Sequence, residues 1–197
     1  MELSLETPPK GVYEALRDGL GIRHTYNTLY FDVYSTGLTL TEPHPVYQLT
    51  LTSLINGSFL NEAFLVSWRF IVLENDSATA AIEVAVKSSP VEAYVFSRWN
   101  VGRYVEGTIE GVSRIETRIS NQNMYLRLLQ IPSLQLTALW LHGPNNPGGP
   151  IDFILPIVSP PAPVEPYLLY TPDTLLSILR PLANDYLDMN DFTEPFG

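Results

Sequence analysis

The chain has 197 residues, of which 45% are apolar, 16% are charged and none is Cys, and its formal net charge is −10. This length suits one domain with a buried core, and the apolar content excludes wholesale disorder. Of the 11 basic residues only two are Lys. Because contact with phosphates needs a basic surface, we exclude nucleic-acid binding. Without Cys, neither disulfides nor Cys-based metal sites can form.

No segment has the pattern of a secretory signal or a membrane span. Residues 1–11 lack a basic start followed by an apolar run. No window approaches the ~18 uninterrupted apolar residues that a membrane helix needs. We therefore expect a cytoplasmic protein that makes no membrane contact.

The N-terminal region predicts a short helix. Thr7 is followed by two Pro residues, which suits a capping residue and a first helical turn. Val12, Leu16 and Leu20 would then share one face, and Gly19 would help to end the helix.

The first candidate site lies on an expected strand over Thr25–Ser35. Its apolar residues alternate with a tyrosine-rich face, as in a half-buried strand. That face carries Tyr26, Tyr30, Asp32 and Tyr34. It could stack a sugar or an apolar ligand, or anchor a protein partner. The alternative interpretation is that it packs under a helix with its hydroxyls reaching water.

Further strands are expected along the next sixty residues. Gly37–Thr41 is extended, Pro43 and Pro45 should break it, and the alternation over Tyr47–Leu54 predicts that the strand resumes.

The clearest element is an antiparallel hairpin. Phe64–Val72 alternates strictly, residues 74–77 are a turn signal, and the alternation returns over residues 80–87. Arg69 and Glu83 lie on the sides of their strands opposite the apolar residues.

A third strand, Val91–Trp99, should lead into a helix over Tyr104–Ile119. The expected apolar stripe of this helix is Val105, Ile109, Val112 and Ile119, with Ile115 close to the same face. Gly107 and Gly111 weaken this prediction, because each costs roughly 1 kcal/mol relative to Ala.

The second candidate site lies where that strand meets that helix. It comprises Arg98, Trp99, Arg103 and Tyr104. Two guanidinium groups beside two aromatic rings could hold an anion or stack on a ring. In the alternative interpretation the Arg stems cover Trp99 and pair with nearby acids.

Three apolar segments predict central strands, namely Met124–Ile131, Leu134–Leu141 and Ile151–Val158. Pro132 and Ser133 would link the first two tightly, and a loop of Gly, Pro and Asn over residues 143–150 would precede the third.

The C-terminal region should be a spacer followed by a helix. Residues 156–166 contain five Pro, which predicts an extended spacer. Thr171 should cap a helix over residues 172–187 that is kinked or split at Pro181. The expected stripe of this helix is Leu175, Leu179, Leu182 and Tyr186. Residues 188–197 form an acidic tail, either a partner-binding segment or a solvated terminus.

The run Leu128–Gly143, followed by the Pro-rich strand and the Leu-rich helix, resembles uncharacterised bacterial proteins with no assigned activity. The resemblance covers about the last third of the chain. It carries no catalytic motif and therefore implies no function.

The order of elements predicts a single α+β domain over residues 1–197. We expect a mainly antiparallel sheet, strongly bent or barrel-like, with about three short helices packed on it.

Catalytic and metal motifs are sparse. His24, His44 and His142 show no ligand spacing, so we expect no metal and no cofactor. The sequence has no phosphate-binding glycine loop and no nucleophile elbow. Glu106 and Glu110 are neighbours on a helix, but Glu110 also lies four residues before Arg114, a normal surface arrangement. No catalytic residue is predicted.

Three hypotheses for function stay open. The first is a non-enzymatic binding or scaffolding protein that acts through the tyrosine-rich surface. The second is a small-molecule-binding barrel, or an enzyme that uses carboxylates and tyrosines in a cavity. The third is a structural subunit of a bacterial or phage assembly. A cavity of about 300 Å³ or more with a few converging polar groups would favour the second.

Overall fold

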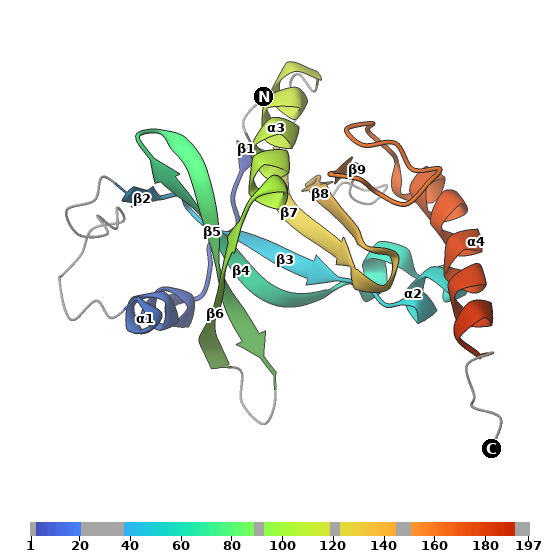
Figure 1. Cartoon of the computed structure of the whole chain (residues 1–197), viewed down its shortest axis with the longest axis horizontal. Coiled ribbons are helices and arrows are strands. Elements are labelled where there is room, and N and C mark those ends of the chain that lie inside the picture. The colour runs from blue at the N-terminus through green and yellow to red at the C-terminus, as the bar shows by residue number, and fades with distance from the viewer. Residues whose placement is uncertain (1–2, 21–37, 89–92, 119–122, 145–150, 192–197) are drawn as a thin grey trace.

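A computed structural model describes residues 3–20, 38–88, 93–118, 123–144 and 151–191 (Figure 1). These residues form an α+β fold, which confirms the predicted class, with one large mixed sheet and four α-helices. The strands are β1 (Leu3–Ser4), β2 (Leu38–Leu40), β3 (His44–Gln48), β4 (Phe64–Glu74), β5 (Ser77–Lys87), β6 (Ala93–Val101), β7 (Met124–Ile131), β8 (Leu136–His142) and β9 (Asp152–Ile157). The helices are α1 (Lys10–Gly19), α2 (Leu51–Asn56), α3 (Arg103–Arg118) and α4 (Pro172–Asp191), with 3₁₀ turns η1 (Phe59–Glu62) and η2 (Pro132–Leu134).

The strand order along the sheet is β6-β5-β4-β3-β7-β8-β9, with β1 added beside β7 and β2 beside β4. Most neighbours are antiparallel, but β3 and β1 both run parallel to β7. The sheet is therefore mixed, and its end strands β6 and β9 do not pair with each other. The expectation of a mainly antiparallel, barrel-like sheet holds only in part, because the sheet bends without closing.

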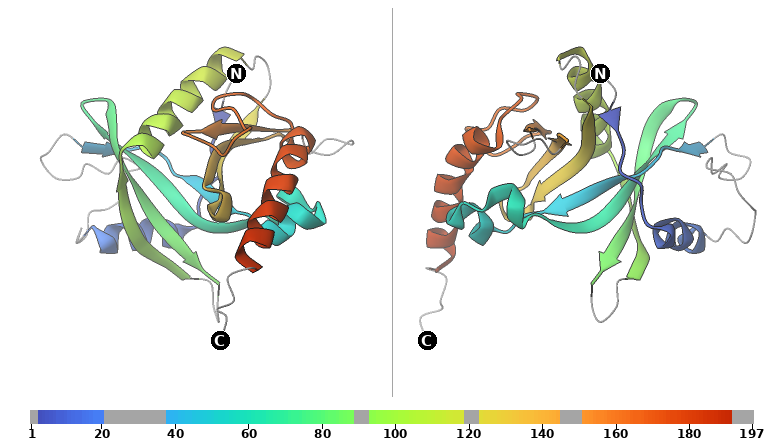
Figure 2. Two further views of the ribbon diagram at one scale, coloured as in Figure 1. Left: turned by 45° about the vertical axis from the view of Figure 1, so that its right-hand side comes forward. Right: turned by 180° about the vertical axis from the view of Figure 1, so that it is seen from behind.

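Helix α3 lies in the concave face of this bent sheet. It contacts β5 and β6 in one arm and β8 and β9 in the other, which is possible because the sheet curves around it (Figure 2). The opposite face is covered by α1 beside β5 and β6, and by α2 and α4 at the other end (Figure 1). In the part of the chain that the structure describes, no helix is long and apolar enough to cross a membrane.

The predicted hairpin is confirmed as β4 and β5. Glu74 pairs with Ser77, so the turn has two residues. Both turn residues, Asn75 and Asp76, have positive φ, of 49° and 64°. This is the turn geometry whose twist matches that of the strands, and Asn and Asp tolerate it best after Gly.

The third strand and the long helix are also confirmed, as β6 and α3, but the expected stripe of the helix holds only in part. Val105 and Ile115 are buried, whereas Ile109 is exposed. The side facing the sheet includes both glycines. A Cβ on Gly107 would lie 2.3 Å from Val158 Cγ2, and one on Gly111 would lie 2.7 Å from Leu139 Cδ1. These glycines let the helix approach the sheet closely.

Replacing Gly111 with Val is therefore expected to destabilise the protein by about 1–3 kcal/mol, because the added carbons overpack the interface with Leu139. Urea denaturation measures this change. Ser113→Val is the matched control, since Ser113 lies on the same helix but is exposed. The control should stay within about 0.5 kcal/mol of wild type. A Gly111→Val variant that is as stable as the control would contradict the close packing.

The region 43–56 corrects the sequence prediction. Pro43 and Pro45 do not break the chain, because β3 begins at His44 and includes Pro45. Pro45 precedes the residues of β3 that pair with β7, so it has a strand neighbour on one side, β4. The predicted strand over Tyr47–Leu54 is wrong beyond Gln48, where α2 follows. The side chain of Thr50 accepts a hydrogen bond from the backbone N–H of Ser53 (3.2 Å) and caps this helix.

The start of α1 is a second correction. The residue before the helix is Pro9, and no side chain caps it, so Thr7 is not the cap. The helix ends at Gly19 as predicted, and Val12 and Leu16 are buried.

The C-terminal strands are confirmed as β7, β8 and β9, with η2 as the tight link. The segment after β9 is free of helix up to Tyr170, as predicted, but it packs on the core rather than acting as a simple spacer. Val164 is buried, and the backbone N–H of Tyr167 donates to the carbonyl of Pro156 (2.8 Å).

Helix α4 starts at the predicted cap. The backbone N–H of Thr174 donates to Thr171 Oγ1 (3.4 Å). The helix is not split, since it runs through Pro181 to Asp191, four residues past the predicted end. Its fully buried residues are Leu175, Leu179 and Ala183, whereas Tyr186 is exposed. Residues 188–191 of the expected acidic tail are helical, and the rest of the tail lies outside the described residues.

Candidate functional site

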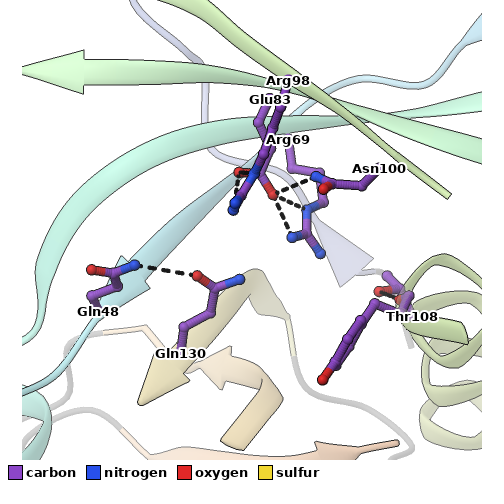
Figure 3. Close-up of polar contacts among 8 residues, drawn as sticks. Gln48, Arg69, Glu83, Arg98, Asn100, Thr108 and Gln130 are labelled. Atoms are coloured by element: carbon purple, nitrogen blue, oxygen red, sulfur yellow. Dashed lines mark hydrogen bonds and ion pairs between the residues drawn. The ribbon is translucent and has the colours of Figure 1, made fainter. Parts of the chain in front are cut away.

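A row of ionisable side chains crosses the concave face of the sheet. In the strand register His44 lies opposite Arg69, Arg69 opposite Glu83, and Glu83 opposite Arg98. Directly opposite residues of antiparallel strands share a face. Four adjacent strands, β3 to β6, therefore contribute one polar residue each to a single line (Figure 3 shows its last three members).

Glu83 is the centre of this row. Its Oε1 accepts from Arg69 Nε (2.9 Å), from Arg69 Nη2 and from Asn100 Nδ2 (3.1 Å). Its Oε2 accepts from Arg98 Nε (3.1 Å) and Nη2 (2.9 Å). Burial by itself would raise the pKa of Glu83, but the charges and hydrogen bonds of the two guanidinium groups outweigh it and lower that pKa. Glu83 is thus ionised at neutral pH with both oxygens occupied.

The two arginines differ in their access to solvent. The side chain of Arg69 is 5% exposed and that of Arg98 is 55% exposed. Nη1 of each guanidinium takes no part in the hydrogen bonds to Glu83. Arg98 can therefore contact a bound molecule while it remains paired with Glu83.

A β-bulge brings Arg98 into this position. The register between β5 and β6 shifts between Glu83 and Val84, so that Arg98 faces Glu83 while Phe96 faces Val84. Ser97 is the extra residue. Bulges of this kind redirect side chains at the edges of sheets.

These side chains form one wall of a cavity of about 340 Å³. The cavity occupies the part of the concave face beside the start of α3. Its lining residues are Arg69, Arg98, Asn100, Val101, Tyr104, Val105, Gln130, Pro132, Gln135, Leu136 and Thr137. Below we call it the arginine pocket. Gln130, an uncharged residue, lies on the wall opposite the arginines, where its Oε1 accepts a hydrogen bond from Gln48 Nε2 (3.4 Å) (Figure 3).

The charge of the pocket is opposite to that of the whole chain. Two guanidinium groups face one carboxylate, which leaves one positive charge in a chain with a net charge of −10. Tyr104 and Val105, in the first turn of α3, also line the pocket. The N-terminal end of a helix adds partial positive charge there. The arrangement favours an anion.

The same walls offer little for acid–base chemistry. The lining residues given above include no carboxylate, His, Lys or Cys. Glu83 lies behind the arginines with its oxygens occupied by five hydrogen bonds. A general base needs a free lone pair within reach of its proton, and the carboxylate of Glu83 does not offer one to the pocket.

The second candidate site of the sequence analysis is only partly assembled. Arg98 and Tyr104 line the pocket, but Trp99 does not, because it lies opposite Ile82 on the other face of the sheet. Arg103 lies with its guanidinium 5.4 Å from the ring of Tyr104 and is not among the lining residues. The first candidate site, Tyr26, Tyr30, Asp32 and Tyr34, lies outside the described residues.

The histidines and helical carboxylates do not build a second centre. His24 lies outside the described residues, His44 is buried beside Arg69, and His142 is held by Asp152 (Nδ1 to Oδ1, 2.8 Å). Among the described residues, no group of three His, Cys, Asp or Glu side chains could hold a metal ion. Glu110 pairs with Arg114 as the spacing predicted.

A histidine side chain normally becomes protonated just below neutral pH, but His44 does not. It is 3% exposed, and its Nε2 has no hydrogen-bond partner. Burial, and then the charge of Arg69, lower its pKa to about 3. His44 is therefore neutral beside a permanent cation, which keeps the row from accumulating a third positive charge.

Comparison of this chain with protein-family models, with curated proteins and with solved structures gave no significant match. The resemblance of the last third to uncharacterised bacterial proteins therefore stays a prediction.

Proposed function

We propose that this protein binds a small organic anion in the arginine pocket. The observation that carries the proposal is the pairing of Arg69 and Arg98 around a single carboxylate at the wall of a 340 Å³ cavity. Cavities of about 300–1,000 Å³ with a few converging polar groups are typical of small-molecule sites. The proposal follows the second of the three sequence hypotheses, without its catalytic component.

The lining residues differ in exposure and charge, and therefore in their roles in binding. Arg98 is half exposed, so its free N–H groups meet the anion, while Glu83 holds the guanidinium in a fixed orientation. Arg69, which is almost completely buried in the pocket wall, adds positive charge near the anion. Tyr104, Gln130 and Thr137 offer neutral hydrogen-bonding groups for the rest of the molecule.

The first test is a titration with two probes, butyrate and inorganic phosphate, followed by NMR of the backbone and side-chain amides. We expect butyrate to shift the side-chain amide signals of Asn100, Gln130 and Gln135 at millimolar concentrations. Arg98→Gln should weaken butyrate binding about tenfold, because it removes a charge-assisted hydrogen bond worth about 1.5 kcal/mol. Glu83 keeps its bonds to Arg69 and Asn100 in this variant, so the fold should persist.

Arg114→Gln is the matched control. Arg114 is also a half-exposed guanidinium paired with a Glu, but it lies outside the pocket. This variant should bind butyrate as wild type does. The proposal is wrong if neither butyrate nor phosphate shifts the three amide signals at tens of millimolar. It is also wrong if Arg98→Gln binds both probes as tightly as wild type does. Phosphate binding without butyrate binding would assign the pocket to phosphorylated molecules instead.

A further inference from the structure

A second cavity adjoins the arginine pocket and has the opposite character. Its volume is about 360 Å³, and it lies between η2 and helix α4. Its lining residues are Ser133, Leu134, Gln135, Ser159, Pro161, Leu182, Asp185, Tyr186 and Met189. We call it the apolar pocket because more than half of its lining residues are apolar or aromatic, and Asp185 is the one carboxylate among them.

Gln135 lines both cavities. It follows η2 with a φ of 52°, a conformation that non-Gly residues rarely adopt. The tip of the β7–β8 hairpin therefore has the arginine pocket on one side, beside Thr137, and the apolar pocket on the other, beside Leu134. Gln135 is thus the residue that the two cavities share.

We infer that the ligand of this site is a long-chain carboxylate. Its carboxylate would lie against Arg98, and its hydrocarbon chain would pass Gln135 into the apolar pocket. This inference rests on the proposed function and specifies its substrate class. Charge complementarity selects the head group, and the neighbouring apolar walls select the tail.

The exposure of the α4 side chains supports an apolar occupant. Met189 is 71% exposed and Tyr186 is 41% exposed, although both line the apolar pocket. Exposed apolar side chains gathered at a cavity are typical of binding sites, and the flexible Met side chain can adapt to a chain of variable length. Contact with a hydrocarbon chain would remove this surface from water.

The test compares butyrate, octanoate and decanoate by calorimetry, each kept below its micelle concentration. Affinity should increase about two- to fourfold for each added methylene, because burying a methylene is worth up to ~0.8 kcal/mol. Met189→Asp places a second carboxylate in the apolar pocket, in addition to that of Asp185, and should abolish this increase, while butyrate binding stays at the wild-type level. Arg98→Gln should weaken binding of all three acids.

Leu187→Asp is the matched control, since Leu187 is exposed on the same helix but does not line the pocket. It should keep the dependence on chain length. If butyrate binds through Arg98 and decanoate binds no more tightly, the inference fails and the proposed function stands. If none of the acids binds, both fail. Equal loss of the chain-length effect in Met189→Asp and Leu187→Asp would also overturn the inference.

Discussion

The variant Glu83→Gln is expected to be less stable than wild type by about 3–5 kcal/mol. Glu83 is 3% exposed, and Arg69 beside it is equally buried. Removing the carboxylate charge leaves a buried guanidinium without a counter-ion, which is far more costly than the net value of the intact pair. Gln retains the shape and one acceptor oxygen, so the loss comes from charge rather than from a cavity. Urea denaturation at neutral pH measures the free energy of unfolding.

Two further variants isolate this effect. Glu110→Gln removes a carboxylate that pairs with Arg114 on the surface, and its stability should stay close to wild type. The double variant Arg69→Met, Glu83→Gln should recover part of the stability lost in Glu83→Gln, because no buried charge remains uncompensated. A Glu83→Gln variant as stable as Glu110→Gln would show that Arg69 and Glu83 do not form a buried ion pair.

The elements of the fold were largely predictable because their signals are local. The strict alternation over Phe64–Val72, the polar turn after it, and the cap at Thr171 each determine structure within a few residues. The wrong assignment at Leu51–Asn56 has a local cause as well. A segment of six residues is too short to distinguish the periodicity of a helix from that of a strand. The Thr50 cap and packing against α4 select the helix.

The site itself was predictable only in part. Arg98 and Tyr104 stand close together in the sequence, so their cluster could be recognised. The pairing of Arg69 with Glu83 could not be read from the turn. Counting outward from the pair Glu74–Ser77 places Arg69 opposite Ile82, on the wrong face. A register shift between Val72 and Leu73 moves Glu83 into that place.

The opposite wall of the pocket depends on contacts that are distant in the sequence. Gln130 and Thr137 reach the concave face because β7 pairs in parallel with β3, about eighty residues earlier in the chain. Parallel strands are not joined by a short turn, so the sequence carries no local signal for this pairing. In the same way Gly107 and Gly111, which weaken the prediction of a helix, make sense only when β8 and β9 are known to lie against α3.

The stability of the protein is expected to fall as the pH drops from about 6.5, and His44 is the cause. Its pKa is lowered to about 3 in the folded state from 6.5 in the unfolded chain. Between these values the unfolded chain binds a proton that the folded protein does not, so acid favours unfolding. The loss should reach roughly 2 kcal/mol at about pH 5, at 1.36 kcal/mol per pH unit. Glu83 adds to this loss at lower pH: because its pKa is lowered in the folded state, its stabilisation declines as the pH falls through the ordinary range of a carboxyl and is lost below the lowered pKa.

His44→Phe tests this assignment. Phe fills a similar volume and cannot be protonated, so the difference in unfolding free energy between about pH 7.5 and about pH 5 should shrink by roughly 2 kcal/mol relative to wild type. The comparison uses a difference between two pH values, so any change in overall stability caused by the substitution cancels. His142→Gln, which retains a hydrogen-bonding group beside Asp152, should keep the loss that His44 causes. If wild type and His44→Phe lose the same stability on acidification, then His44 is protonated in the folded state, and the row from β3 to β6 carries a third positive charge after all.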